Sequence, residues 1–181
     1  RMIKIVSGIR RCGKSYLLSE LFTQHLLDEG VDRHHIIHID LDTRDNLEFR
    51  NPDACNQYVK SLIKDDNMYY LLLDEVQLME DFVSVLNGFL HIKNLDVYVT
   101  GSNSKFLSSD IVTEFRGRGD EIRVYPLSFA EIYPIYDNNW EKAWGDYTVY
   151  GGIPLVFAYQ KEEDKVKYLK NLFKETYQLQ Q

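Results

Sequence analysis

The 181-residue sequence has little of several features that mark particular protein classes. Its two cysteines, Cys12 and Cys55, are too few for a disulfide framework, and neither has the paired spacing of a zinc site. No apolar run approaches the ~18 residues of a membrane span, and Arg10 and Arg11 interrupt the N-terminal segment before a signal-peptide core could form. Internal repeats and low-complexity stretches are also absent. These absences predict a soluble, cytoplasmic protein without a membrane partner.

Positive charge is also scarce, because 21 Lys and Arg residues stand against 28 Asp and Glu residues, giving a net charge of −7. Proteins that hold nucleic acid over most of their surface are normally basic. The remaining composition, 44% hydrophobic and 27% charged, is that of an ordinary globular domain. We therefore expect about one domain, with any nucleic-acid contact confined to a local surface or to a region outside this chain.

Short apolar segments alternate with segments of helical periodicity as far as Pro126. The alternation predicts an α/β fold in which helices flank a parallel sheet of five strands. The expected strands are 2–7, 35–41, 68–73, 97–100 and 121–125, and the expected helices are 16–29, 52–63 and 80–92.

The pattern becomes helical after Pro126. Ser128 and Glu131 have the spacing of a capping box, a helix is expected to begin near Trp140, and another is expected over 162–177. The sequence thus divides into an α/β core, residues 1–126, and a short helical extension, residues 127–181.

Residues 8–15 read Gly-Ile-Arg-Arg-Cys-Gly-Lys-Ser and match the Walker A pattern GxxxxGK[ST] between an expected strand and helix. The two glycines let backbone N–H groups turn toward phosphate oxygens. Lys14 would reach the β- and γ-phosphates, and the Ser15 hydroxyl would ligate Mg²⁺. The pattern predicts a P-loop NTPase whose nucleotide-binding residues are Gly8, Ile9, Arg10, Arg11, Cys12, Gly13, Lys14, Ser15 and Tyr16.

Three side chains inside this loop have open roles. Arg10 and Arg11 either add charge beside the phosphates, contact a partner, or are solvated loop arginines. Cys12 follows two basic residues near a helix N-terminus, where a thiol can become reactive, although redox regulation is the less favoured interpretation.

The expected strand 68–73 delivers two adjacent carboxylates, Asp74 and Glu75, in a Walker B pattern. Asp74 would hold Mg²⁺, and Glu75 would act as the general base for the attacking water. A strand that merely ends in surface acids is the alternative. A GTPase is disfavoured because Gln77 stands where the Asp-x-x-Gly switch needs glycine, and no Asn-Lys-x-Asp motif is present. Adenine nucleotide is therefore the expected ligand.

Two further polar groups follow later strands. Asn103, after the strand 97–100, can hydrogen-bond the attacking water or the γ-phosphate if that strand lies beside the Asp74 strand. Arg116 and Arg118 precede the last strand, and an arginine there can stabilise transition-state charge on the chain's own nucleotide or on a neighbour's. Helix-end capping or pairing with acids is the alternative for these arginines.

Together these motifs resemble prokaryotic AAA-type ATPases whose P-loop domain precedes a domain of restriction-endonuclease-like fold. The resemblance is carried by residues 7–15, 71–77, 100–104, 115–118, 126–129 and 151–154. It implies ATP with Mg²⁺, a strand order of 5-1-4-3-2, Asn103 as sensor, and Arg116 or Arg118 as a finger within a homo-oligomer or toward a partner. Members of that family continue past the Gly-Gly-x-Pro region, so we expect this chain to be the ATPase part of a longer protein.

The predicted activity is Mg²⁺-dependent ATP hydrolysis that drives or gates an attached domain or partner. The alternatives are a nucleotide-dependent switch with little turnover, a DNA-processing ATPase, and a P-loop kinase, against which the adjacent Asp74 and Glu75 argue. Three other groups are interpreted as structural rather than as ligand sites: the histidines 34, 35 and 38, the aspartates 40, 42 and 45, and the basic stripe of Lys167, Lys170 and Lys174.

Overall fold

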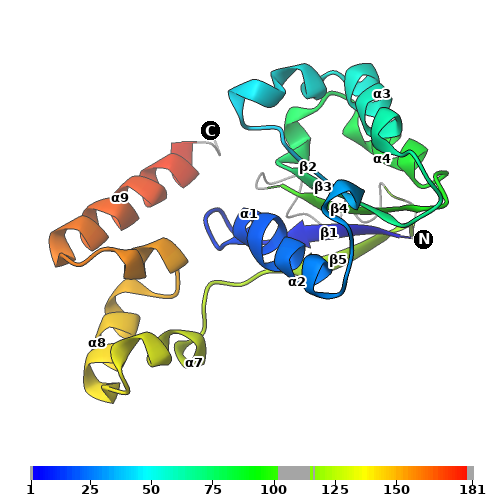
Figure 1. The fold of residues 1–181 in the computed structure, drawn as a ribbon. Helices are drawn as coiled ribbons and strands as arrows, with labels where there is room; N and C mark the ends of the chain where they lie inside the picture. Colours follow the sequence, from blue (N-terminus) through cyan, green and yellow to red (C-terminus); the bar gives the residue numbers. More distant parts are fainter. Residues whose placement is uncertain (1, 102–114, 116, 179–181) are drawn as a thin grey trace. The chain divides into compact units, whose positions relative to one another are not determined.

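The structure is a computed structural model that describes residues 2–101, 115 and 117–178 (Figure 1). It consists of two compact units. The first unit comprises Arg1–Gly8 and Lys14–Arg123, and the second comprises Ile9–Gly13 and Val124–Gln181. Each unit is described separately below.

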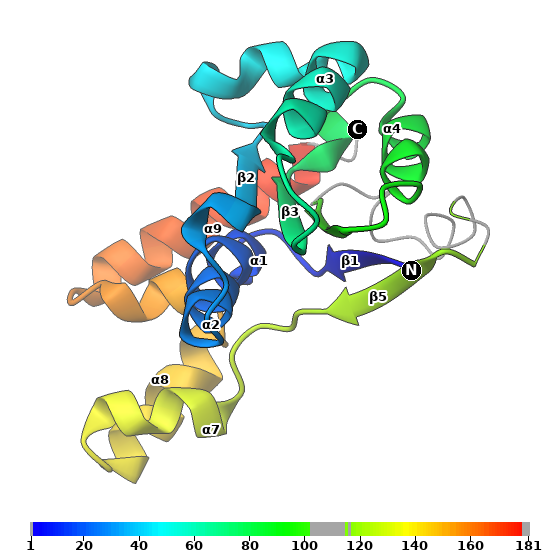
Figure 2. The same cartoon turned by 45° about the vertical axis from the view of Figure 1, so that its right-hand side comes forward.

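The first unit is built on a five-stranded sheet in the order β2-β3-β4-β1-β5. Its strands are β1 (Ile3–Ser7), β2 (Ile36–Asp40), β3 (Tyr69–Asp74), β4 (Leu95–Thr100) and β5 (Gly119–Arg123). All four pairings are parallel, and Figure 2 shows β1 and β5 running side by side in the same direction. The predicted fold class and the order 5-1-4-3-2, read from the opposite edge, are confirmed.

Strand β3 shows why its apolar run forms the middle of the sheet. Leu71, Leu72 and Leu73 are all fully buried, although successive residues on a strand point to opposite faces. Leu71 and Leu73 belong to the main core, whereas Leu72 belongs to a second cluster on the other face. A strand covered on both faces therefore carries a continuous apolar run.

Helices cover both faces of this sheet. The helices are α1 (Lys14–Tyr16), the π-helical segment η1 (Leu17–Phe22), α2 (Thr23–Asp28), α3 (Pro52–Leu62) and α4 (Phe82–Phe89). Short 3₁₀ segments also occur at η2 (Arg33–His35), η3 (Arg44–Arg50) and η4 (Val76–Leu78). Residues of α3 and α4 share the main core, and Leu26 of α2 lies in the cluster on the opposite face.

Two of these helices differ from their expected form. The expected helix 16–29 is continuous but includes the π-helical segment, where the Thr23 hydroxyl donates to the Leu18 carbonyl, five residues earlier, at 3.1 Å. The expected helix 80–92 is shorter because Asp81 has a left-handed φ of 44° that delays its start. It ends at Phe89, and the next turn closes with 3₁₀-type bonds such as that from the His91 N–H to the Gly88 carbonyl.

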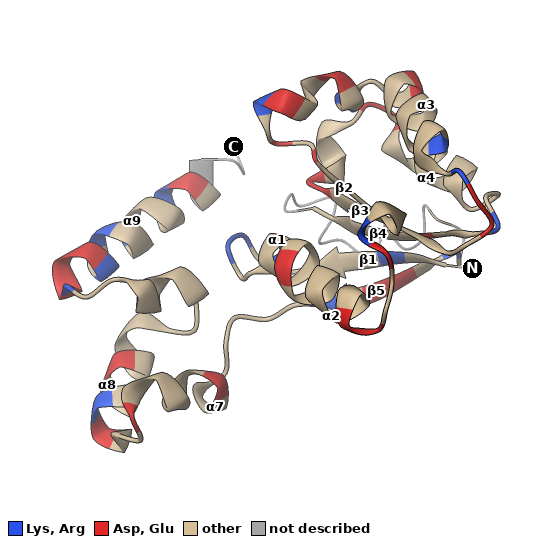
Figure 3. Ribbon diagram, viewed as in Figure 1, with Lys and Arg blue, Asp and Glu red and all other residues tan. Residues whose placement is uncertain are grey.

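The second unit is helical and has its own small core. Its elements are α7 (Phe129–Ile132), η5 (Tyr133–Tyr136), α8 (Trp140–Tyr150), η6 (Pro154–Ala158) and α9 (Glu162–Gln178). The capping box of Ser128 and Glu131 is present as expected. Gly152 is required because a Cβ there would lie 2.0 Å from the Leu127 carbonyl oxygen. Figure 3 shows acidic and basic residues interspersed along α9, as the interpretation of a solvated face predicts.

Within the described part of the chain, no helix combines the length and the apolar character that crossing a membrane would need.

Candidate functional site

The phosphate loop connects β1, which ends at Ser7, to α1, which begins at Lys14. Positive φ angles recur along it, with 151° at Gly8, 63° at Arg11 and 101° at Gly13. Alternation of left-handed and ordinary backbone turns successive N–H groups to one side and makes a concavity for anions. The Lys14 ammonium is buried and donates to the Gly8 carbonyl at 3.1 Å, so it lies over the loop that it follows. Ser15 and Tyr16 follow in α1, both exposed.

The two predicted carboxylates lie where β3 ends. Asp74 is the last residue of β3 and is 5% exposed, and Glu75 follows it with a left-handed φ of 54°. Because all strands are parallel, this end of β3 lies at the same edge of the sheet as the end of β1. The topology therefore brings Lys14 and Ser15 to the sheet edge that carries Asp74 and Glu75.

Thr100, which the sequence motifs gave no separate role, positions both carboxylates. It ends the neighbouring strand β4 and is fully buried. Its hydroxyl donates to Asp74 Oδ1 and accepts the backbone N–H of Glu75 at 3.1 Å. A hydroxyl at the carboxyl end of the expected strand 97–100 is the sequence signal that could have identified it.

The side chain of Glu75 has a partner of its own. The Gln77 amide donates from Nε2 to Glu75 Oε2, which restrains the carboxylate that would act as the base. Glycine at this position, as in the GTPase switch, would lack this donor. Gln77 therefore does more than mark the lack of a GTPase switch glycine, because its side chain holds the Glu75 carboxylate.

A second polar pair lies at the ends of β1 and β5. The Ser7 hydroxyl donates to Glu121 Oε1 at 2.6 Å, and Arg123 Nη2 lies 3.3 Å from the same oxygen. The hydrogen bond from Ser7 holds the pKa of Glu121 below its ordinary value of 4.5. Neither Glu121 nor Arg123 was predicted, because only the pairing of β1 with β5 brings them beside Ser7.

The remaining predicted residues lie elsewhere. Asn103 and Arg116 fall outside the described residues. Arg118 is exposed and precedes β5, and its carbonyl accepts the Ile3 N–H at 2.8 Å. Arg118 thus lies at the edge of the sheet where the strands begin. The length of β5, five residues at ~3.3 Å each, separates it from the edge where the strands end. That separation disfavours contact between Arg118 and a nucleotide bound by its own chain.

The loop residues Ile9–Gly13 group with the second unit. Arg10 Nη2 and Arg11 Nη2 lie 4.0 Å and 3.7 Å from Glu175 Oε2 on α9. The Cys12 thiol is 3% exposed and donates to the Val124 carbonyl at 3.5 Å. The arginines are therefore ion-paired, and the burial of Cys12 argues against a reactive thiol.

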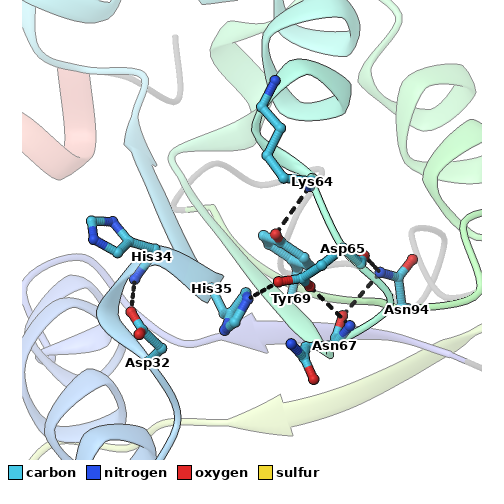
Figure 4. A network of polar contacts seen from close by, with 8 residues as sticks. All are labelled: Asp32, His34, His35, Lys64, Asp65, Asn67, Tyr69 and Asn94. Atoms are coloured by element: carbon cyan, nitrogen blue, oxygen red, sulfur yellow. Dashed lines mark hydrogen bonds and ion pairs between the residues drawn. The ribbon is translucent and has the colours of Figure 1, made fainter.

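The histidine-rich segment forms a network at the edge where β2 and β3 begin (Figure 4). His35 Nε2 lies 3.1 Å from Asp65 Oδ2, and Asn94 Nδ2 donates to the carbonyls of Asp65 and Asn67, each at 2.9 Å. The Lys64 N–H donates to the Tyr69 hydroxyl at 3.0 Å. The described residues contain no group of three or more His, Cys, Asp or Glu side chains able to hold a metal ion. These contacts tie loops together.

Comparison with known proteins relates most of the chain to a known domain family. A family model described as an AAA domain, AAA_14, matches residues 1–133. An uncharacterized protein of Haemophilus influenzae is 30% identical over 160 residues, which cover 85% of this chain and 40% of that protein. An uncharacterized protein of Methanocaldococcus jannaschii is 27% identical over 183 residues, covering 93% and 39% respectively. The chain thus spans about two fifths of the length of these relatives.

Solved structures show the same fold at low sequence identity. PCH-2 of C. elegans superposes with a TM-score of 0.53 and 16% identity, covering 77% of this chain and 39% of that one. Hsp104 of S. cerevisiae, solved in a complex with casein, gives a TM-score of 0.51 and 17% identity, covering 77% and 26%.

Proposed function

The chain belongs to the AAA_14 family of AAA domains, and on that basis we propose that it binds ATP with Mg²⁺ and hydrolyses it to ADP and phosphate. The energy would drive or gate an attached domain or a partner. The observation that carries the proposal is the arrangement of Asp74, Glu75 and Thr100 at the sheet edge that also receives the phosphate loop.

The donor set fits a hard cation. Mg²⁺ prefers oxygen ligands, and the Ser15 hydroxyl and the Asp74 carboxylate supply two at the same sheet edge. The hydrogen bond from Thr100 fixes one oxygen of Asp74 and leaves the other as a donor for the cation. When bound, Mg²⁺ would neutralise charge on the phosphate oxygens.

The protein groups divide the remaining work. Lys14 would exchange the Gly8 carbonyl for a phosphate oxygen and keep its positive charge beside the transferred group. Glu75, held by Gln77, would take the proton of the attacking water. At the same time the water oxygen would bond to the γ-phosphorus, and the bond from that phosphorus to the leaving ADP oxygen would break. Arg118 would act on a nucleotide bound by a neighbouring copy, because its own site lies at the opposite edge of the sheet.

The test measures ATP affinity and phosphate release for the protein and two variants. Lys14→Ala should lose ATP affinity, and Glu75→Gln should keep it while phosphate release falls about 100-fold or more, since a positioned base contributes that much. Glu80→Gln, an exposed carboxylate a few residues away, is the matched control and should hydrolyse ATP normally. Equal turnover by Glu75→Gln and the unaltered protein would refute Glu75 as the base.

A second candidate is a nucleotide-dependent switch with little intrinsic turnover. The hydrogen bond from the Gln77 amide to the Glu75 carboxylate favours it, because that bond occupies an oxygen which would otherwise accept the water proton. This candidate predicts tight ATP binding, lost in Lys14→Ala, with phosphate release that remains negligible until a second copy or a partner is added.

A further inference from the structure

Arg11 has a backbone conformation that is uncommon for a residue with a side chain. Its φ is 63°, in the left-handed region where the Cβ crowds the backbone, whereas the two other positive-φ positions of the loop, Gly8 and Gly13, are glycines. A strained position of this kind persists only where the surrounding structure holds it. The question is therefore which groups hold Arg11.

Two side chains of α9 contact the Arg11 guanidinium. Its central carbon lies 5.8 Å from the centre of the Tyr168 ring, within the range of a cation–π interaction, and Nη2 lies 3.7 Å from Glu175 Oε2. Tyr168 and Glu175 are seven residues apart, two helical turns, so they lie on one face of α9. Arg11 is thus held on one face of a single helix.

Tyr168, whose ring contacts the Arg11 guanidinium, is itself held in place by packing. Tyr168 packs against the core of the second unit, formed by Tyr150, Ile153 and Val156. It also lies against Tyr159, with ring centres 5.6 Å apart. A side chain fixed by packing holds its partner at little further cost in conformational entropy.

The neighbouring loop residues are attached to the same unit. The Cys12 thiol donates to the Val124 carbonyl, and a Cβ on Gly13 would lie 3.9 Å from Pro154 Cγ, an ordinary van der Waals distance. Arg11 and Cys12 of the phosphate loop therefore contact residues of the second unit, and Gly13 lies close to Pro154 of the same unit. This explains why Ile9–Gly13 groups with Val124–Gln181 rather than with the strand that precedes it.

We propose that Tyr168 and Glu175 are positioning residues for nucleotide binding: they hold Arg11 in its left-handed conformation and so keep the phosphate loop shaped for the phosphates of ATP. The inference rests on the proposed function, since it concerns the same loop. Coupling of this kind is reciprocal, so bound nucleotide would in turn stabilise the contact between the loop and α9.

The experiment is a double-mutant cycle on ATP affinity, measured with Mg²⁺ and the chain of residues 1–181. Tyr168→Leu and Glu175→Gln should each weaken ATP binding, by about three- to tenfold for Tyr168→Leu and less for Glu175→Gln, whose ion pair is half exposed. Because the chemical groups are untouched, KM should rise while kcat stays constant. Tyr168→Phe, which keeps the ring face, should bind ATP as the unaltered protein does.

The decisive arm uses Arg11→Gly. Glycine adopts a φ of 63° without strain, so ATP binding by Arg11→Gly should not change further when Tyr168→Leu is added. Glu163→Gln, in the exposed first turn of the same helix, is the charge-matched control and should bind ATP normally. Thermal unfolding of each variant checks folding, and Glu175→Gln, a surface change, carries the test if Tyr168→Leu does not fold.

Outcomes separate this inference from the proposed function. ATP binding that is lost in Lys14→Ala but unchanged in both α9 variants would overturn the inference alone. An effect of Tyr168→Leu on ATP affinity that is equally large with and without the Arg11→Gly substitution would also overturn it. If the unaltered protein bound no ATP, the proposed function and the inference would fall together.

Discussion

Polar networks occur at both edges of the sheet, yet among the described residues one edge alone has the features of a site. At the edge where the strands begin, His35, Asp65 and Asn94 satisfy one another and close loops (Figure 4). At the edge where they end, a buried Asp74 and a left-handed Glu75 share one hydroxyl. Backbone strain and a buried carboxylate distinguish the second edge, because a fold retains such costs where they serve a function.

Among the residues that hold the carboxylates in place, the largest effect is expected at Thr100, because its hydroxyl contacts both Asp74 and Glu75. Thr100→Val keeps the shape of the side chain but removes the hydroxyl that holds Asp74 and Glu75. A buried carboxylate left without its donor costs about 1–3 kcal/mol of stability, and we expect phosphate release to fall about 100-fold. Thermal unfolding and a phosphate-release assay measure the two effects. Thr43→Val, which removes an exposed hydroxyl that donates to the Asp40 carbonyl, is the control.

A smaller effect is expected from replacing Gln77, whose side-chain amide donates a hydrogen bond to Glu75. Gln77→Met conserves length but removes the amide that donates to Glu75, so the carboxylate loses one restraint. We expect kcat to fall by about tenfold with unchanged ATP affinity, as a hydrogen bond to a charged group is lost. An increase in kcat would instead mean that Gln77 restrains the base in an inactive position, as in the switch interpretation.

The smallest effect is expected at the opposite edge. The hydrogen bonds from His35 and from the Asn67 backbone lower the pKa of Asp65 below its ordinary value of 3.8. A carboxyl whose pKa is lowered on folding adds stability above its unfolded pKa and loses it as the pH falls through the folded value. The melting temperature of the unaltered protein should therefore approach that of Asp65→Asn below about pH 4, whereas at neutral pH it should be slightly higher. A gap between the two that does not narrow on acidification would contradict this account.

The sequence predicted the sheet more completely than the site. The continuous apolar run of β3 could be recognised because a central parallel strand is buried on both faces, and the expected helix 52–63 begins at the same residue as α3. The late start of α4 could not be predicted from the sequence, because the left-handed backbone of Asp81 is set by its surroundings. Local pattern therefore predicts elements well and their ends less well.

Roles that depend on neighbouring strands or on distant elements could not be predicted from the sequence. Thr100 acquires its role because β4 pairs with β3, and Arg118 lies at the far edge because β5 runs parallel to β1. The contact of Arg11 with Tyr168 joins residues near opposite ends of the chain, which no local pattern reveals. The predicted roles of Asn103 and Arg116 stay predictions.

The central claim is that chemistry occurs at the edge where the strands end, with Glu75 as its base. The most direct test compares steady-state phosphate release from ATP by two variants that each remove one carboxylate charge, Glu75→Gln at that edge and Asp65→Asn at the other. The account predicts turnover about 100-fold or more below that of the unaltered protein for Glu75→Gln and equal turnover for Asp65→Asn. Equal turnover in both variants, or a larger loss in Asp65→Asn, would contradict it.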